Sequence, residues 1–312
     1  PVLRFFGWAM LGVLLAFLIE NLLVVWWGMP GFRSLFRGGG GWGALAIYVV
    51  CVAAASTQVL MDGQRSLRRD AARITAFNAY LVRSLFWAVL LVGLADAAIA
   101  LLRAENELPA LVGAEMARSL SLSHFVGPYV HGPLILLGFV IGIFARSLGF
   151  MWLALLIVAA ELAIVLSRFV FSYEQALMSD LVRYWYAALF LFASAYTLLD
   201  EGHVRVDVLY AAFNDRKKGA VNAIGAVVLG MTTCWLILDI GLNGRTSIIN
   251  NPIVSFEVSQ TGVTGMFVKY QMAGFLAVFA VTMLIQFVSQ MFEAVADLRD
   301  EPGRRESTPV AH

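Results

Sequence analysis

Long runs of hydrophobic residues alternate with short polar connections along the whole chain. A helix needs about 20 mostly apolar residues to cross the hydrocarbon core of a bilayer, and these runs are that long. They predict eight spans, at residues 5–27, 41–61, 84–103, 130–146, 150–170, 184–199, 219–241 and 271–293. Because the runs are continuous rather than alternating over about ten residues, a membrane β-barrel is excluded. The predicted fold class is all-α, a polytopic membrane protein with about eight transmembrane helices.

The fourth and fifth spans are divided by the short segment 145–149 (ARSLG), which we interpret as a tight turn. A single helix over 132–170 would greatly exceed the bilayer thickness, although a seven-helix arrangement stays open. Eight spans place both termini on one side, together with the basic stretches 65–73 and 216–218. The positive-inside rule then predicts that both termini are cytoplasmic. The first apolar run lacks a small-residue cleavage site, which predicts a retained helix rather than a signal peptide.

The polar connections differ in character. The short basic loop 62–73 (DGQRSLRRDAAR) is expected to contact the headgroups of anionic membrane phospholipids. On the outer side, 104–129 carries three glutamates and 242–270 is rich in uncharged polar residues, so either could meet an extracytoplasmic protein or simply be solvated. The tail 299–312 has the composition of a disordered segment.

One further segment is expected to be ordered outside the spans. Ser172 and Gln175 have the spacing of a capping box, and apolar residues then recur every three or four positions up to Tyr184. This pattern predicts a short amphipathic helix on the outer interface. The alternative is that these residues continue the sixth span.

Composition supports a membrane protein and removes several function classes. Hydrophobic residues make up 60% of the chain and charged residues 14%, and the formal net charge is +1. With no global positive field, nucleic-acid binding is not expected. The two cysteines lie in apolar runs and the histidines in polar stretches or at span edges, so no metal or other cofactor is predicted. Motifs of hydrolases, metalloproteases and phosphate-binding loops are missing, so the protein is not expected to be an enzyme.

Four acidic residues lie inside predicted spans, where a charge costs on the order of 2.5–3.5 kcal/mol. They are Glu20, Asp96, Glu161 and Asp239. We expect Glu20 and Asp96 to bind neighbouring helices, because Asn21 follows the first and Gly93 precedes the second. The alternative is a proton or ion relay through Asp96 and Glu161. No span is interrupted by Pro at mid-depth, as a transporter's own binding site usually is, which favours the structural interpretation.

The most distinctive stretch, 200–210 (DEGHVRVDVLY), follows the sixth span. It resembles the E-G-H-x-x-V-D-x-L signature of the small membrane subunit, the DctQ-like or Q subunit, of tripartite ATP-independent periplasmic (TRAP) transporters. Ser167–Phe171 (SRFVF) and Asp180–Tyr184 (DLVRY) are similar to the close of that family's first helix and the entry to its second. The similarity covers about 150–298, so the chain resembles a long variant with additional N-terminal helices.

The resemblance implies a division into an N-terminal four-helix extension (1–149), a DctQ-like domain (150–298) and a cytoplasmic tail (299–312). It implies a subunit of the bacterial inner membrane without a substrate site of its own. Its partners would be a large M subunit, which moves an organic anion with sodium, and a periplasmic solute-binding protein, the P subunit. The Q subunit would brace the immobile scaffold of M and help to dock the binding protein.

The residues expected at the subunit interface, or in structural roles, are those of the resembling motifs and the intramembrane acids. They are Arg168, Asp180, Arg183, Glu201, His203, Arg205, Asp207, Glu161, Asp96 and Glu20. We expect Arg168 and Arg183 to form ion pairs near the outer ends of their helices, and His203 to be a hydrogen-bonding residue rather than a metal ligand. Two other functions stay open: a self-sufficient carrier or channel using Asp96 and Glu161, and a membrane assembly factor.

Overall fold

A computed structural model describes residues 2–61, 65–145, 150–174, 176–199, 210, 212–259 and 264–303. Over these ranges the protein is helical, without a β-strand. Eight helices in this part of the chain are long and apolar enough to cross a membrane, and they correspond one to one to the predicted spans. The predicted fold class, all-α and polytopic, is therefore confirmed.

The membrane-spanning elements are α1 (Val2–Trp27), α2 (Trp42–Met61), α3 (Leu67–Ala104), α7 (Gly132–Phe144), α8 (Phe150–Phe171), α9 (Ala176–Leu199), α12 (Thr232–Gly241) and α14 (Lys269–Leu298). Two of these are extended at their N-terminal ends through π-helical turns. The extensions are α6 (Ser123–Val126) with η2 (Gly127–His131), which lead into α7, and α11 (Asp215–Gly225) with η3 (Ala226–Met231), which lead into α12. Connecting segments contain η1 (Phe32–Arg37), α4 (Leu108–Val112), α5 (Ala114–Leu120) and α13 (Asn250–Val254).

The division between the fourth and fifth spans is confirmed. Helix α7 ends at Phe144, and Ala145 has an extended backbone with φ −74° and ψ 116°. Helix α8 then begins at Phe150. Residues 146–149 of the predicted turn lie outside the described part of the chain.

Helix α3 corrects the predicted loop at 62–73. It begins at Leu67 and has 38 residues, so residues 67–83 extend the expected span at its N-terminal end. Polar residues on this extension continue the helix because they bind other helices: Arg68 and Asp70 both form ion pairs. Hydropathy detects only the apolar part of a helix, so it misses a helical segment whose polar side chains form ion pairs.

A second correction concerns the predicted interfacial helix. Residues 176–184 are the first turns of α9, which continues without interruption to Leu199. The alternative interpretation, a continuation of the sixth span, is therefore the correct one. Gln175 of the expected capping box lies outside the described residues.

The chain forms two compact units. The first contains residues 1–78, 197–247 and 280–312, and the second contains residues 79–196 and 248–279. Each unit thus combines segments from the first and second halves of the sequence. The long helices α3, α9 and α14 contribute residues to both units.

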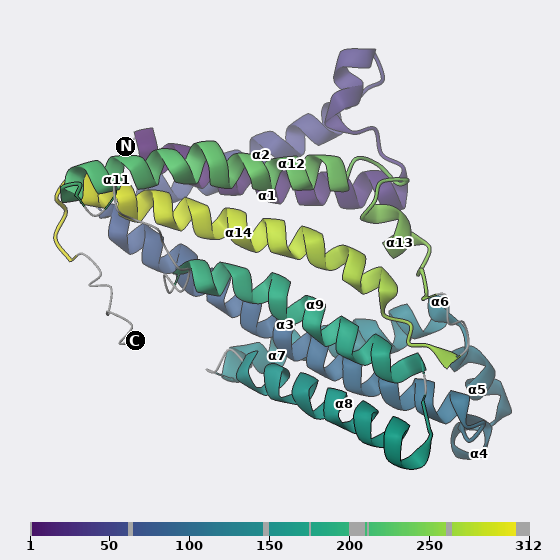
Figure 1. Ribbon diagram of the computed structural model, residues 1–312. Helices are drawn as coiled ribbons and strands as arrows, with labels where there is room; N and C mark the ends of the chain where they lie inside the picture. The colour runs from purple at the N-terminus through teal and green to yellow at the C-terminus, as the bar shows by residue number, and fades with distance from the viewer. Residues whose placement is uncertain are drawn as a thin grey trace. The chain divides into compact units, whose positions relative to one another are not determined.

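The first unit is held by close approach of its helices. A Cβ atom on Gly12 of α1 would lie 3.0 Å from the Cα atom of Val52 in α2, so the two backbones nearly touch. Helices α1 and α12 run side by side (Figure 1), where the rings of Phe17 and Trp235 meet edge to face with centroids 5.6 Å apart. Small residues at a helix crossing are typical of packing inside membranes.

The second unit uses the same device around a more aromatic core. Helices α3 and α9 run side by side (Figure 1), and the rings of Phe86 and Phe192 meet with centroids 5.8 Å apart. On α7, a Cβ atom on Gly138 would lie only 2.6 Å from the Cα atom of Ala88 in α3. This tight packing fixes the part of α3 that carries Asp96.

Candidate functional site

Three charged side chains of the second unit bind backbone atoms of three successive residues just before α14. They come from α3 and α9, and we call them, together with segment 264–268, the loop clamp. Arg103 Nη2 donates to the Gly265 carbonyl at 2.6 Å. The Met266 amide donates to Asp180 Oδ2 at 3.1 Å. The Phe267 amide donates to Asp96 Oδ2 at 2.6 Å. Hydrogen bonds to charged groups each contribute about 1.5–3 kcal/mol. Segment 264–268 is therefore fixed from both sides by ionised groups.

Arg103 makes further contacts from the last turn of α3. Its Nη1 atom donates to the Leu120 carbonyl at 3.2 Å, and its guanidinium stands 4.0 Å from the centroid of the Phe267 ring. A cation over an aromatic ring is attracted by the ring quadrupole, more strongly where water is excluded. Arg103 thus joins α3 to α5 and to the clamped segment.

Asp96 lies at the centre of a buried polar chain. Its second oxygen, Oδ1, is 3.4 Å from His131 Nε2, and neither residue has any exposed side chain. The Nδ1 atom of His131 is 2.8 Å from the Tyr270 hydroxyl, which accepts a bond from Gln271 Nε2 at 3.1 Å. The Tyr184 hydroxyl donates to Gln271 Oε1 at 2.5 Å and so adds α9 to the chain of bonds. Asp96 is thus enclosed by α3, η2 and α14.

Asp180 also uses both carboxylate oxygens. Besides the Met266 amide, its Oδ2 atom accepts from the Ser259 hydroxyl at 3.1 Å. Its Oδ1 atom lies 3.7 Å from Arg183 Nη1, one turn along α9. The residues of the expected acidic-Leu-x-Arg pattern are thus close together, with the acid buried and the arginine exposed.

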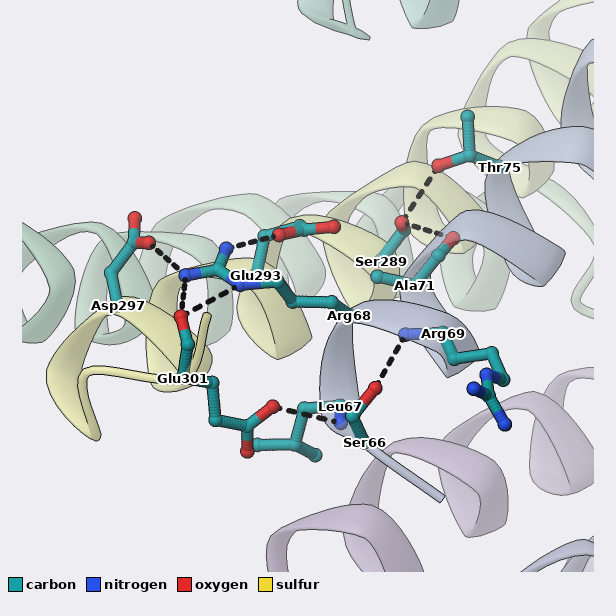
Figure 2. Close-up of polar contacts among 10 residues, drawn as sticks. All are labelled: Ser66, Leu67, Arg68, Arg69, Ala71, Thr75, Ser289, Glu293, Asp297 and Glu301. Atoms are coloured by element: carbon teal, nitrogen blue, oxygen red, sulfur yellow. Dashed lines mark hydrogen bonds and ion pairs between the residues drawn. The ribbon is translucent and has the colours of Figure 1, made fainter. Parts of the chain in front are cut away.

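In the first unit, Arg68 is the centre of a second charged cluster (Figure 2). From the first turn of α3 it donates to Glu293 Oε2 and Asp297 Oδ1 of α14, both at 2.8 Å. Its Nε and Nη2 atoms also reach the Glu301 carbonyl, at 3.2 and 2.9 Å. Glu301 belongs to the tail that was predicted to be disordered, and its carboxylate accepts from the Leu67 amide at 3.2 Å.

This cluster changes the expected role of the basic segment 65–73. Arg68 is occupied by Glu293 and Asp297, and Arg65 lies 3.9 Å from Asp70. Asp70 is fully buried and also accepts from Arg4 Nε at 2.7 Å. Of the arginines in this segment, Arg69 and Arg73 have exposed side chains. Exposure thus separates Arg69 and Arg73 from the paired Arg65 and Arg68.

Glu20 binds groups of the same unit near one end of α1. Its Oε2 atom accepts from the Tyr48 hydroxyl at 2.6 Å, and its Oε1 atom accepts from the Phe32 amide at 2.6 Å. Asp239, near the end of α12, forms an exposed ion pair with Arg33 at 2.5 Å. Both acids therefore hold the segment around η1.

The remaining predicted residues lie on the surface or outside the described part. Arg168 pairs with Glu174 at 3.5 Å, with both side chains more than half exposed. Glu161 is exposed in the middle of α8. Glu201, His203, Arg205 and Asp207 lie outside the residues that the structure describes. In the described residues, no group of three His, Cys, Asp or Glu side chains is placed to hold a metal ion.

Sequence reasoning missed His131 and Arg103. His131 was placed at the edge of the fourth span, whereas it is completely buried on η2, between two Gly-Pro pairs that form the π-helical turn and the start of α7. Arg103 lies seven residues after Asp96, two helical turns along the same face. The spacing of Asp96 and Arg103 was the signal in the sequence that could have identified Arg103.

These features define an integral membrane protein whose described residues contain eight helices suited to span a membrane and buried charges bound by groups of the same chain. Residues 156–297 match the family model described as "Tripartite ATP-independent periplasmic transporters, DctQ component". Over this region the chain is similar to the small membrane subunit of TRAP transporters, and further helices precede the matched region. The family is one of transporter components rather than of enzymes. No match to this chain was found among curated proteins or solved structures.

The Arg68 cluster predicts unequal effects for two adjacent arginines. Arg68→Ala leaves Glu293 and Asp297 without their cation, and we expect a loss of about 1–2 kcal/mol of stability. Arg69→Ala removes the same charge from an exposed side chain that points away from the cluster (Figure 2), so it serves as the matched control. Thermal unfolding of the detergent-solubilised protein measures the difference. Equal midpoints for the two variants would contradict this account.

The loop clamp predicts faster exchange of specific amides when an acid is removed. In Asp180→Ala the Met266 amide loses its charged acceptor, and its hydrogen exchange should accelerate about 10- to 100-fold. Glu115→Ala, an exposed acid of the same unit, should leave this exchange unchanged. Hydrogen–deuterium exchange followed by mass spectrometry over 264–268 gives the answer. Unaltered exchange in Asp180→Ala would show that the carboxylate does not hold the segment.

Proposed function

We propose that this chain braces the scaffold of the large M subunit of a sodium-coupled TRAP transporter for organic anions. The observation that supports this most directly is the binding of three acids, of which Asp96 and Asp180 are buried and Glu20 is partly buried. Glu20, Asp96 and Asp180 accept hydrogen bonds from fixed groups of the chain itself, including backbone amides. An acid that bound and released a proton or ion during transport would need to leave such partners in every cycle. Buried acids held in this way suit a static subunit.

The loop clamp supports a second part of the proposal, that this subunit helps to dock a periplasmic solute-binding protein. Segment 264–268 belongs to the connection 242–270, which we place on the periplasmic side. Holding its backbone by Arg103, Asp96 and Asp180 reduces the entropy that a partner would otherwise have to overcome on binding.

The remaining assignments follow from the family and the charge pattern. We place the subunit in the bacterial inner membrane with both termini in the cytoplasm. Residues 1–149 form the extension, 150–298 the DctQ-like domain and 299–312 the tail. We assign Arg168, Arg183, Glu201, His203, Arg205 and Asp207 to contacts with the M subunit or to the support of such contacts. Anionic phospholipids contact the exposed Arg69 and Arg73.

The alternative, a self-sufficient carrier using Asp96 and Glu161, has less support. Asp96 is fully buried and bonded to the Phe267 amide, whereas Glu161 is exposed on α8. No hydrogen bond or ion pair joins the two acids in the described structure.

Purification from the native membrane tests the proposed function. A tagged full-length chain should bring down a large polytopic subunit in a fixed ratio, because the bracing role needs a permanent complex. Asp96→Asn should lower the yield of this complex. Transport by the complex that still forms should change less than the yield. Recovery of the chain alone as an active oligomer would contradict the proposal. A fully assembled Asp96→Asn complex without transport would favour the carrier instead.

A further inference from the structure

One intramembrane acid differs from the other three. Glu20, Asp96 and Asp239 each bind a donor within the chain. Glu161 is exposed, and none of the described residues donates a hydrogen bond to it. In the other three acids a donor binds the carboxylate, so Glu161 needs a donor that the described residues do not supply.

The depth of Glu161 makes that requirement strong. It lies eleven residues after Phe150 and ten before Phe171, the two ends of α8. With a rise of about 1.5 Å per residue, it is roughly 15 Å from either end, at the middle of a hydrocarbon core of about 30 Å. A charge facing lipid there costs on the order of 2.5–3.5 kcal/mol.

The surface of α8 around Glu161 is organised as a seam for another helix. Ala154, Val158, Glu161, Val165 and Arg168 follow one another at alternating intervals of four and three residues, the spacing of a helix–helix contact. Val158 and Val165 are 65% and 47% exposed, and we call this stripe the Glu161 face. It contains both charged residues of α8.

The neighbouring stripe has the opposite character. Leu155, Leu162 and Phe169 are spaced seven residues apart and are 58%, 57% and 79% exposed, with no polar group among them. Such a stripe suits lipid chains. The chain itself packs the third side of α8, where Leu153 and Ile157 are buried. Of these three sides, the Glu161 face is the one that is both uncovered and polar.

We propose that the Glu161 face binds a membrane-spanning helix of the large partner subunit, and that this helix presents a cationic side chain at the depth of Glu161. The inference rests on the proposed function and names the surface through which this subunit would brace the large subunit. Charge complementarity argues for this occupant. A second copy of the chain, related by a two-fold axis along the membrane normal, would place two Glu161 carboxylates at the same depth. The two carboxylates would then repel each other.

The test uses the full chain co-expressed with the large subunit and measures how much large subunit is recovered per tagged chain. Glu161→Lys should lower this recovery at least tenfold, since it sets two cations against each other. The double variant E161A/A163E keeps the composition but moves the carboxylate about 200° around α8, and it should lower recovery as well. Leu162→Ala, on the lipid-facing stripe, is the matched control and should leave recovery unchanged. Full recovery with Glu161→Lys or with E161A/A163E would overturn the inference.

A second measurement covers the case in which a charge variant fails to fold. A photo-crosslinking amino acid at Val158 or Val165 should form an adduct with the large subunit. An adduct with a second copy of the chain, or none from either valine position, would overturn the inference.

The bracing role and the Glu161 face are contradicted by different outcomes. If the unaltered chain recovers no large subunit, the proposed function is wrong. If it recovers the large subunit and the changes at residues 158–165 have no effect, the bracing role stands and the Glu161 face is not its site.

Discussion

An ionised group inside a bilayer must be bound by fixed polar groups, and this constraint organises each of the two units. In the first unit, Asp70 is buried against Arg4, and Glu20 accepts from Tyr48 and the Phe32 amide. In the second, Asp96 and Asp180 accept from successive amides of one segment. Removing a partner from a buried charge is strongly destabilising, because the charge is then less well compensated. The charges therefore fix the helices and loops that they join.

Hydropathy alone located the spans, because crossing a membrane requires an apolar length that few other structures need. It could not locate the ends of α3, where residues 67–83 stay helical through charged contacts with groups more than 200 residues away in sequence. For the same reason the tail was predicted to be disordered from residue 299, whereas Glu301 binds Arg68. Local composition gives no information about such distant pairs.

The candidate site was predicted in part. The intramembrane acids stood out as residues that need an explanation, but their partners did not, since Asp96 binds a backbone amide 171 positions away and any residue has such an amide. Arg103 and His131 were missed because one lies at the end of a span and the other beside glycines and prolines. Residues 200–209 of the motif that carried the family resemblance lie outside the described residues.

The central claim is that this subunit is a fixed support in transport and carries no solute by itself. Reconstitution into liposomes with an imposed sodium gradient tests it most directly, comparing this chain alone with the chain plus the large subunit and the binding protein. The account predicts accumulation of an organic anion with all three components and, for the chain alone, uptake equal to that of empty liposomes. Solute accumulation by the chain alone would contradict it.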